Sequence, residues 1–591
     1  MSWFMFDYLP VEMLYAIFEY LWTNEILNSF LNINDYLNSV ILNYNESFIN
    51  FNSILRPLFD LTCDHLRPDQ VIKLVLSDSN DTPDQSQLFL SRFPIEQFIN
   101  LRAITLIEID DDDAQSILTN LDHMKYLTCM KINPKFHYTH LNIKPQLTRF
   151  IVKYSDVIYF ENQTFIIRNQ LLQLRHLSLT YCSYFQLEYI FRYAPMLTSL
   201  NISIIFATHN GVNSFADCNK ERPPLNLINL TLSLDMSIDC IHSDPIISRA
   251  HLERFLSHMP RLRRLGLIVN CEGNSNLAYG DRWKIFIVER LPLLRIFNFK
   301  FHLEHIYHDK QTILSHFRNS FWLDKNRNWF VAYNSRRSLL FTVPYFAPRS
   351  ILYSGTPVLH NLTTLPIEQY SIFYNMINEL TFDSINEELS YHYTNVDKLI
   401  LLNHKINKAL IDLSRIQCLC VNLSSCPFDT IIQLIRHSMP NLNQLSFNCK
   451  LSLTCSTPII PLEQIRILHM PFFAYSLTDD NFNWSRIFLC VERLSMTVNS
   501  CHEMALLIDR FENLSCASFN IINCCINGRR NLRERRVTRQ WIIENTRRLA
   551  TMDNNNFTCR FEDTNIFTVH LWIGNNNQQQ IKVCYCSTFY S

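Results

Sequence analysis

Apolar residues recur along this chain in a short pattern, in which two residues and then one residue separate three apolar positions. The first positions lie 19 to 35 residues apart, except for one longer gap in mid-chain. They are Leu101, Met124, Leu147, Leu174, Leu197, Leu227, Leu262 and Leu294, and then Ile377, Val396, Ile416, Leu442, Ile465, Val491 and Leu514. Because 47% of the residues are hydrophobic, a single triplet arises by chance in about one window in ten. The regular spacing therefore predicts a repeat.

A helical pattern precedes several of these triplets. Four copies carry a proline two residues before the first apolar position, at Pro195, Pro260, Pro292 and Pro440. The residues one and five positions before each proline are apolar, and three of the four copies are also apolar eight positions before it. This spacing places them on one face of a helix, which ends at the proline. Each such copy is therefore expected to form a helix, a turn and a short strand.

A helix, a turn and a strand at this spacing are typical of leucine-rich repeats. We therefore predict an α/β fold with a degenerate leucine-rich-repeat-like solenoid, and some other α/β layering is the alternative. The apolar strand positions should face the core, and the residues between them should line an open, concave sheet. Several of these intervening residues are polar, which suits a hydrogen-bonding interface with a client protein. The candidate client-binding residues are Ser199, Asn201, Ser203, Asn298, Ser446 and Asn448.

Two other segments have a different pattern. In the gap between the two runs of triplets, a helical stretch at residues 311–325 precedes two strand-like runs, which predicts a hairpin insertion. After the last triplet, a helix at residues 537–549 precedes two further strands, which would cover the apolar edge of the array. The predicted organisation is a helical motif at 1–45, a linker or N-terminal cap at 46–95, repeats at 96–300, an insertion at 301–376, repeats at 377–525 and a helix-hairpin cap at 526–591.

Residues 7–42 have a separate, wholly helical pattern. Pro10 and Glu12 stand in the first turn of a predicted helix, where proline is tolerated and the helix dipole favours an acidic side chain. The apolar residues that follow at helical spacing are Leu14, Ile17, Phe18 and Leu21. Two more short helices are expected near Ile26 and after Asp35. Three short helices bury little apolar surface among themselves, so some of these faces should meet a partner or a neighbouring domain.

The same residues resemble the F-box motif. The order Leu-Pro-x-Glu-x-Leu-x-x-Ile-Phe-x-x-Leu at residues 9–21, followed by Glu-Ile-Leu at 25–27, carries the resemblance. In the third helix the family often has a Cys-Arg-Arg-Trp-like stretch, where residues 32–38 here are Asn-Ile-Asn-Asp-Tyr-Leu-Asn. The chain resembles F-box proteins with leucine-rich repeats, which implies a substrate receptor that binds a Skp-type adaptor and, through it, a cullin in a ubiquitin ligase. The implied adaptor-binding residues are Leu9, Pro10, Glu12, Leu14, Ile17, Phe18, Leu21, Ile26 and Leu27.

Glycine is scarce, with 7 residues in 591, and no two glycines are close enough to form a phosphate-binding loop or a nucleophile elbow. Such loops need glycine because backbone N–H groups must approach the ligand without a Cβ in the way. No acid–base or nucleophile arrangement can be recognised either. We therefore expect a protein that is not an enzyme.

The charges nearly cancel, with 53 Lys and Arg against 54 Asp and Glu. This balance argues against nucleic acid or an anionic membrane as the main partner. One basic cluster, at residues 529–548, is expected to be a solvated helix face and loop. Binding of nucleic acid or of an acidic degradation signal by this cluster is the alternative.

No metal or other cofactor is expected. His302, His305 and His308 are three residues apart and would spread over more than one face of a helix or strand, which makes a shared metal site awkward. The closely spaced cysteine pairs lack the spacing of structural zinc sites. The acidic run at residues 110–113 precedes an apolar helical stripe and is expected to begin a helix rather than to bind calcium.

Several features predict a cytoplasmic or nuclear protein. The first ten residues lack the basic region of a signal peptide, and no uninterrupted apolar run is long enough for a membrane span. The 19 cysteines are scattered and odd in number, as expected for reduced thiols. The favoured function, which the F-box resemblance implies, is a client-recognition adaptor of a ubiquitin ligase. The alternative is a leucine-rich-repeat interaction scaffold without a ubiquitin role, in which residues 1–45 only cap the array.

Overall fold

The computed structural model describes residues 9–574 except for short segments. The segments outside the description are 135–145, 154–169, 183, 207–223, 237–248, 271–274, 304–309, 325–326, 328, 335–337, 354–361, 383–391, 404–405, 407–409, 424–425, 450, 453–459, 472–483, 523–536, 553–555 and 564–566. The chain divides into two compact units. The central unit comprises Arg102–Arg349 and Thr356–Ile377, and the terminal unit comprises Met1–Leu101, Ser350–Gly355 and Asn378–Ser591.

The central unit contains a sheet in which one strand follows another in chain order. Its parallel strands are β3 (Ala103–Ile107), β4 (Cys129–Asn133), β5 (Arg149–Val152), β6 (His176–Cys182), β7 (Ser199–Phe206), β8 (Asn229–Met236), β9 (Arg264–Asn270) and β10 (Ile296–His302). An antiparallel hairpin of β11 (Phe330–Asn334) and β12 (Leu339–Val343) continues it, with β12 beside β10. This hairpin lies in the segment where the sequence indicates one.

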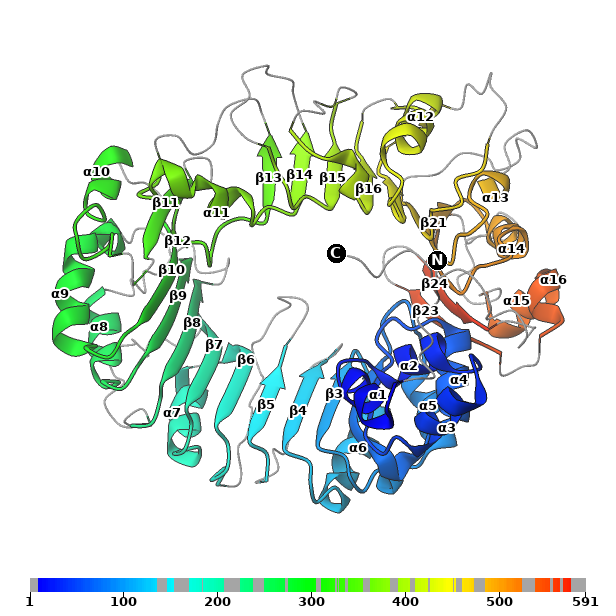
Figure 1. The fold of residues 1–591 in the computed structure, drawn as a ribbon, viewed down its shortest axis with the longest axis horizontal. Coiled ribbons are helices and arrows are strands. Elements are labelled where there is room, and N and C mark those ends of the chain that lie inside the picture. Colours follow the sequence, from blue (N-terminus) through cyan, green and yellow to red (C-terminus); the bar gives the residue numbers. More distant parts are fainter. Residues whose placement is uncertain are drawn as a thin grey trace. The chain divides into compact units, whose positions relative to one another are not determined.

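Helices cover one face of the central sheet, and α7, α8, α9 and α10 line that side (Figure 1). The helices of this unit are α6 (Asp111–Thr119), α7 (Tyr184–Tyr193), α8 (Arg249–Ser257), α9 (Gly280–Arg290), α10 (Lys310–Ser315) and α11 (Tyr370–Tyr374), with 3₁₀ turns η4 (Asn120–His123), η6 (Ser275–Ala278) and η7 (Ile367–Gln369). Alternate strand residues are fully buried toward the helices, as Leu200 and Leu230 are in neighbouring strands. The helix–turn–strand order, repeated along a parallel sheet, makes this unit leucine-rich-repeat-like.

One repeat differs in register from the sequence prediction. The predicted triplet Met124, Leu127 and Cys129 is wrong, because Met130 and Ile132 are the residues of β4 that pair with the buried Ile104 and Leu106 of β3. Cys129 is half-buried on the opposite face of the sheet. Met124 and Leu127 are both buried before the strand begins. Because Met124, Leu127 and Met130 are three residues apart, the triplet could be started at Met124 or at Leu127, and the structure supports Leu127.

The terminal unit has a second sheet of the same kind. Its parallel strands are β13 (Ser350–Tyr353), β14 (Glu379–Phe382), β15 (Lys398–Leu401), β16 (Cys418–Val421), β18 (Gln444–Phe447), β20 (Ile467–Met470), β21 (Arg493–Val498) and β22 (Cys516–Ile521). The antiparallel pair β24 (Phe567–Ile573) and β23 (Phe557–Asp563) completes it, with β24 beside β22. The two-residue strands β17 (Cys426–Pro427) and β19 (Leu451–Ser452) pair separately. The helices of this part are α12 (Phe428–Ser438), α13 (Trp484–Ile487), α14 (Cys501–Arg510), α15 (Arg539–Asn545) and α16 (Arg547–Ala550), with the 3₁₀ turn η8 (Leu413–Arg415).

The first hundred residues of the terminal unit begin with three short helices, α1 (Val11–Phe18), α2 (Thr23–Phe30) and α3 (Asp35–Asn43). They continue as β1 (Ser47–Asn50), α4 (Arg56–Asp64), η2 (Pro68–Gln70), β2 (Val71–Ser77), α5 (Gln85–Arg92) and η3 (Ile95–Gln97). β1 and β2 pair in parallel. The segment 46–95, expected to be a linker or cap, thus carries two strands and two helices.

This early segment packs against the hairpin β23–β24, which lies far away in sequence. The Trp572 indole N–H donates to the carbonyl oxygen of Ile54 at 2.9 Å, and its ring lies 5.0 Å from that of Phe59. The guanidinium of Arg56, which is fully buried, lies 4.8 Å from the Trp572 ring centre. Arg560 donates to Asn80 Oδ1 at 2.6 Å and also to the carbonyl oxygen of Asp78. Contacts between distant parts of the sequence therefore stabilise the terminal unit.

Candidate functional site: the three-helix motif and the polar strand faces

The three N-terminal helices have a small core of their own. Its buried residues are Leu14, Phe18, Ile26, Leu37, Val40 and Tyr44. The ring of Phe18 lies 5.5 Å from Tyr44 and 5.6 Å from Phe30, so aromatic contacts link all three helices. Burial, together with Glu46 and Glu19, raises the pKa of Tyr44 to about 12. The motif is therefore an ordered bundle.

Local hydrogen bonds explain where these helices begin. The Glu25 carboxylate accepts the backbone N–H of Trp22 at 2.8 Å, which satisfies a donor at the start of α2. Asn34 Oδ1 accepts the backbone N–H of Leu37 at 2.7 Å and caps α3. The Tyr36 hydroxyl donates to the carbonyl oxygen of Leu9 at 2.7 Å and ties α3 to the start of the motif.

The structure divides the nine adaptor-binding candidates by burial. Leu14, Phe18, Ile26 and Leu27 are buried within the chain, Leu9 and Leu21 are half-buried, and Pro10, Glu12 and Ile17 are exposed. A partner can therefore reach Pro10, Glu12 and Ile17 directly, whereas the buried members hold the helices together. Sequence spacing does not separate these groups, because Ile17 and Phe18 both continue the apolar helical pattern.

Further apolar residues of the motif are exposed and were not among the sequence candidates. On and just after α1, Met13 is 53% and Tyr20 is 88% exposed, and they share a side with Ile17, which is 36% exposed. Ile33, Tyr36 and Leu42 are exposed on and before α3. The spacing of Met13, Ile17 and Tyr20 by four and three residues is the signal that could have identified this stripe.

The motif is fixed to the rest of the terminal unit through α2, which packs on α4 and β1. Asn24 Oδ1 accepts the backbone N–H of Asn50 of β1 at 3.3 Å, and the Lys73 ammonium of β2 lies 4.2 Å from the centre of the Trp22 ring. Leu27 is buried and lies outside the three-helix core. One helix of the motif thus meets its own chain, and α1 keeps an open side.

The client-binding candidates lie on the two sheets. Ser199, Asn201 and Ser203 belong to β7, and Asn298 belongs to β10, all in the central unit. Their side of the sheet is opposite to the buried leucine side, and Asn201 is exposed. One row across the strands runs Ser178, Asn201, Thr231, Gly266 and Asn298 in register. The structure therefore brings four candidates onto one face.

Ser446 and Asn448 lie in the terminal unit and take part in a local hydrogen-bond network. The Ser446 hydroxyl donates to Asn448 Oδ1 at 3.1 Å, and the Asn448 amide donates to Cys420 Sγ at 3.1 Å. Burial raises the pKa of the Cys420 thiol, so it remains protonated at neutral pH. A client would have to compete with these contacts.

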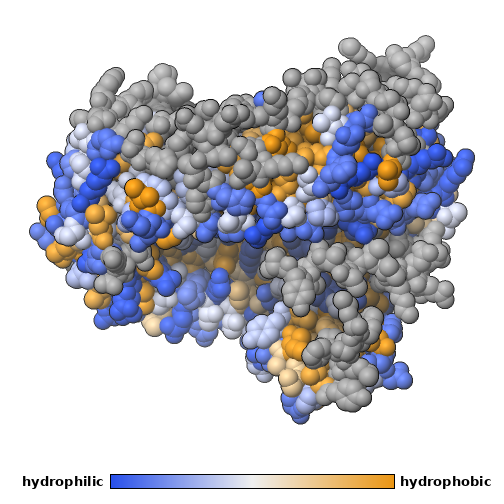
Figure 2. Space-filling view, turned by 45° about the horizontal axis from the view of Figure 1, so that its top comes forward, coloured by the Kyte–Doolittle hydropathy of each residue, from blue (hydrophilic) through white to orange (hydrophobic). Residues whose placement is uncertain are grey.

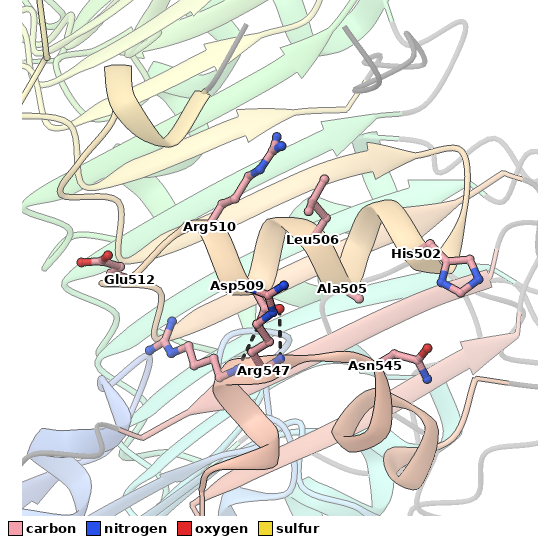
Figure 3. Close-up of a pocket in the computed structure, with 9 residues that line it drawn as sticks. His502, Ala505, Leu506, Asp509, Arg510, Glu512, Asn545 and Arg547 are labelled. Atoms are coloured by element: carbon pink, nitrogen blue, oxygen red, sulfur yellow. Dashed lines mark hydrogen bonds between the residues drawn. The ribbon is translucent and has the colours of Figure 1, made fainter. Parts of the chain in front are cut away.

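A groove of about 840 Å³ lies between α14 and the pair α15–α16 (Figure 3). The Asp509 carboxylate accepts the backbone N–H groups of Arg547 and Arg548 at 3.0 and 2.9 Å. The Arg548 guanidinium donates to the carbonyl oxygens of Phe511 and Leu514, and burial lowers its pKa. Arg548 thus holds α16 against α14. Within the basic cluster at 529–548, residues 529–536 lie outside the described part.

Ser518, His570 and Glu562 form a row across β22, β24 and β23. Ser518 Oγ lies 3.0 Å from His570 Nδ1, and His570 Nε2 lies 3.5 Å from the Glu562 carboxylate. These residue types form hydrolase triads, but acyl transfer also needs backbone or side-chain donors for the oxyanion. β22 pairs with β21 on one side and β24 on the other, so its backbone N–H groups are committed to the sheet. The row therefore stabilises the packing of the hairpin.

The described residues contain no group of three or more His, Cys, Asp or Glu side chains placed to hold a metal ion. His305 and His308 lie outside this part of the chain, as do Cys524, Cys525, Cys584 and Cys586. The acidic run begins α6 at Asp111, as its sequence indicates. In the described segments, every helix is too short or too polar to cross a bilayer.

No family model and no curated protein sequence matches the chain. Among solved structures, one described as a TLR13–ssRNA13 complex is similar over 76% of this chain and 67% of that chain. The two are 15% identical, with a TM-score of 0.26. A similarity at this level identifies neither a family nor a function.

Proposed function

We propose that the protein is a substrate-recognition adaptor of a Skp–cullin–F-box-type ubiquitin ligase. The three-helix motif binds a small Skp-type adaptor and, through it, a cullin, and the polar strand faces bind a client protein. The observation that carries the proposal is the exposed apolar stripe of Met13, Ile17 and Tyr20, in a motif whose residues resemble an F-box.

The energetics of the stripe favour a partner. Fully burying a large apolar side chain stabilises a complex by about 1.5–3 kcal/mol, before the cost of association. Neighbouring side chains of this kind on one helix form the typical anchor of a helical interface. The described surface shown in Figure 2 is mostly hydrophilic, with apolar residues in separate groups. Exposed apolar neighbours also occur on α9, at Ile285 and Val288, so the F-box resemblance distinguishes the stripe of α1.

The proposal is tested by a pull-down of the full chain with a Skp-type adaptor. We expect the wild type to bind, and the double variant Met13→Asp/Ile17→Asp to bind at least about tenfold more weakly, because two carboxylates would be desolvated in the interface. The matched control is Leu172→Asp, which changes another exposed apolar residue, 56% exposed, in the central unit. It should bind as the wild type does.

Leu14 is not a suitable probe of this interface. Its side chain is fully buried in the three-helix core, so Leu14→Ala creates a cavity and costs about 2–5 kcal/mol of stability. Circular dichroism should show that the Met13→Asp/Ile17→Asp variant keeps the wild-type helix content. Equal binding by this variant and the wild type would refute the proposed role of the stripe.

A second candidate is an interaction scaffold without a ubiquitin role. The observation that favours it is the packing of α2 on α4 and β1, through which the motif covers part of its own unit. If folded wild-type protein does not bind any Skp-type adaptor, this scaffold function replaces the first proposal.

A further inference from the structure

The open face of the central sheet carries unpaired positive charge. On β3–β10, the residues between the buried positions belong to the face of the sheet opposite to the buried side chains. Five of these positions, counting the residue that follows β5, are lysine or arginine: Lys131, Arg149, Lys153, Arg264 and Lys300. We call these five residues the basic face. Within the described part of the central unit, none of the five forms an ion pair, and the ion pairs found there join Arg249 to Glu253, His316 to Asp281 and Arg327 to Asp324.

In the terminal unit, by contrast, cations on or beside the strands form ion pairs. Lys398 pairs with Glu379 on the neighbouring strand at 2.6 Å, and Arg466 pairs with Glu492 at 3.3 Å. Arg493 pairs with Asp81 at 3.0 Å. Positive charge on that sheet is neutralised within the chain, whereas the basic face is left to solvent and to partners.

His176 lies beside the cations of β5. His176 of β6 is in register with Arg149 of β5 and follows Arg175 in sequence. Its pKa is lowered, first by burial and then by the positive charges of Arg149 and Arg175. Among the described residues, no acidic side chain contributes to this shift. The charges of described residues that act on His176 are thus positive.

In the described strands between the two groups of cations, most outward positions are polar and uncharged, and Asp235 at the end of β8 is acidic. Lys131, Arg149 and Lys153 belong to β4 and β5, and Arg264 and Lys300 belong to β9 and β10. The middle of the face carries Ser178, Ser199, Asn201, Asn229 and Thr231. Adjacent strands are about 4.8 Å apart, so the two groups lie about 20 Å apart and suit an extended segment. Gly266 lies in the middle of this face and adds no side chain to it. A Cβ at this position would lie only 3.2 Å from Thr231 Oγ1.

The composition of this face favours a polypeptide over a nucleic acid. Single-stranded nucleic acids are held by positive grooves that also offer aromatic rings for the bases to stack on. Where the strands β3–β10 alternate regularly, the outward positions carry no Phe, Tyr or Trp, and Tyr181 lies in the irregular end of β6. Serine, threonine and asparagine side chains can instead bind peptide groups by hydrogen bonds. The cations can then bind Asp and Glu carboxylates.

We propose that the basic face binds an acidic, extended segment of the client protein. This inference rests on the proposed client-binding role and names the chemistry of the client, but it does not depend on the ubiquitin ligase. Ser199, Asn201 and Asn298 then bind the client backbone, and the five cations select for acidic side chains.

The test measures binding of a fluorescein-labelled poly-glutamate peptide to the full chain by fluorescence anisotropy, at low and at physiological salt. We expect binding that weakens as salt rises, because the charges are exposed. The double variant Lys131→Glu/Arg149→Glu should bind about tenfold more weakly or worse. The matched control Arg254→Glu/Arg290→Glu makes the same charge change on the exposed side of α8 and α9 and should bind as the wild type does.

Three outcomes would overturn the inference. Folded wild type could fail to bind poly-glutamate, the control could lose as much affinity as the face variant, or a labelled oligothymidylate could bind more tightly and be lost in the face variant. If the glutamate variant does not fold, Lys131→Gln/Arg149→Gln is measured instead. The face variant should still bind the Skp-type adaptor, and Met13→Asp/Ile17→Asp should still bind poly-glutamate, so the two proposals fail separately.

Discussion

Adjacent residues of this chain differ sharply in their surroundings, because one step along a helix or strand turns the side chain to another face. In α1, Phe18 is fully buried, whereas Ile17 is 36% exposed. In β4, Met130 is buried and Cys129 is half-buried on the other side. Sequence spacing identified Ile17 and Phe18 as apolar helix residues and missed Met13 and Tyr20. It could not assign each one to core or surface, because the packing of α2 and α3 decides this.

Buried cysteines give a prediction at this scale. Burial raises the pKa values of Cys63, Cys182 and Cys516 to about 12, and the thiolate is the form that alkylating reagents attack. We expect iodoacetamide at pH 8 to leave these three thiols unmodified in the folded protein and to modify them in urea, as read by mass spectrometry. The half-buried Cys129 serves as the internal comparison and should react first.

The same pKa values have a consequence for stability. The unperturbed thiol pKa is 9.0, so above pH 9 the unfolded chain loses these protons while the folded chain keeps them. Their contribution to the free energy of unfolding is therefore complete below pH 9 and decreases between pH 9 and about 12. Modification of Cys516 in the folded protein as fast as of Cys129 would contradict this picture.

At the scale of elements, the repeated apolar triplet predicted most strands of both sheets. The pattern search missed one strand and misplaced another. The series of triplets was started at Leu101, although Val71, Leu74 and Leu76 of β2 have the same spacing and are fully buried. In the repeat of β4, apolar residues at Met124 and Leu127 allowed the triplet to be placed three residues too early.

The register of β4 can be tested directly. Met130→Asp places a carboxylate in the apolar core between sheet and helices and should unfold the central unit or cost at least about 3 kcal/mol. The neighbouring change Cys129→Asp places it on the partly solvated face and should cost about 1 kcal/mol or less. Urea unfolding followed by circular dichroism measures both. If the two variants lose the same free energy of unfolding, or if Cys129→Asp loses more, the triplet that includes Cys129 is the correct alignment.

At the scale of the whole molecule, the terminal unit joins residues before Leu101 to residues after Asn378, with the central unit between them in sequence. The contacts of Trp572 with Ile54, Arg56 and Phe59 connect these distant parts. Sequence patterns give no sign of this pairing, because no local spacing relates residues 518 positions apart. The N-terminal segment therefore depends for its stability on the hairpin β23–β24.

This dependence predicts the effect of Trp572→Ala. The change removes a fully buried indole and should cost about 3–5 kcal/mol, chiefly in the terminal unit. Hydrogen exchange should become faster in β1, α4 and β2, and exchange in the central-unit strands should be little changed. The matched control Trp541→Ala alters a half-buried tryptophan of α15, and its effect should be smaller. Unchanged exchange in β1 and β2 would contradict the dependence.

The pairing of Ile54 with Trp572 also fixes an order of events during synthesis. At about 5–20 residues per second, Trp572 leaves the ribosome roughly 25–100 s after Ile54. For that time Phe59 and Arg56 lack their contacts with Trp572. The nascent chain therefore presents an aromatic and cationic surface to chaperones. A chain cut before β24 never covers it. The finished and unfinished protein thus differ at a surface more than 500 residues from the cut.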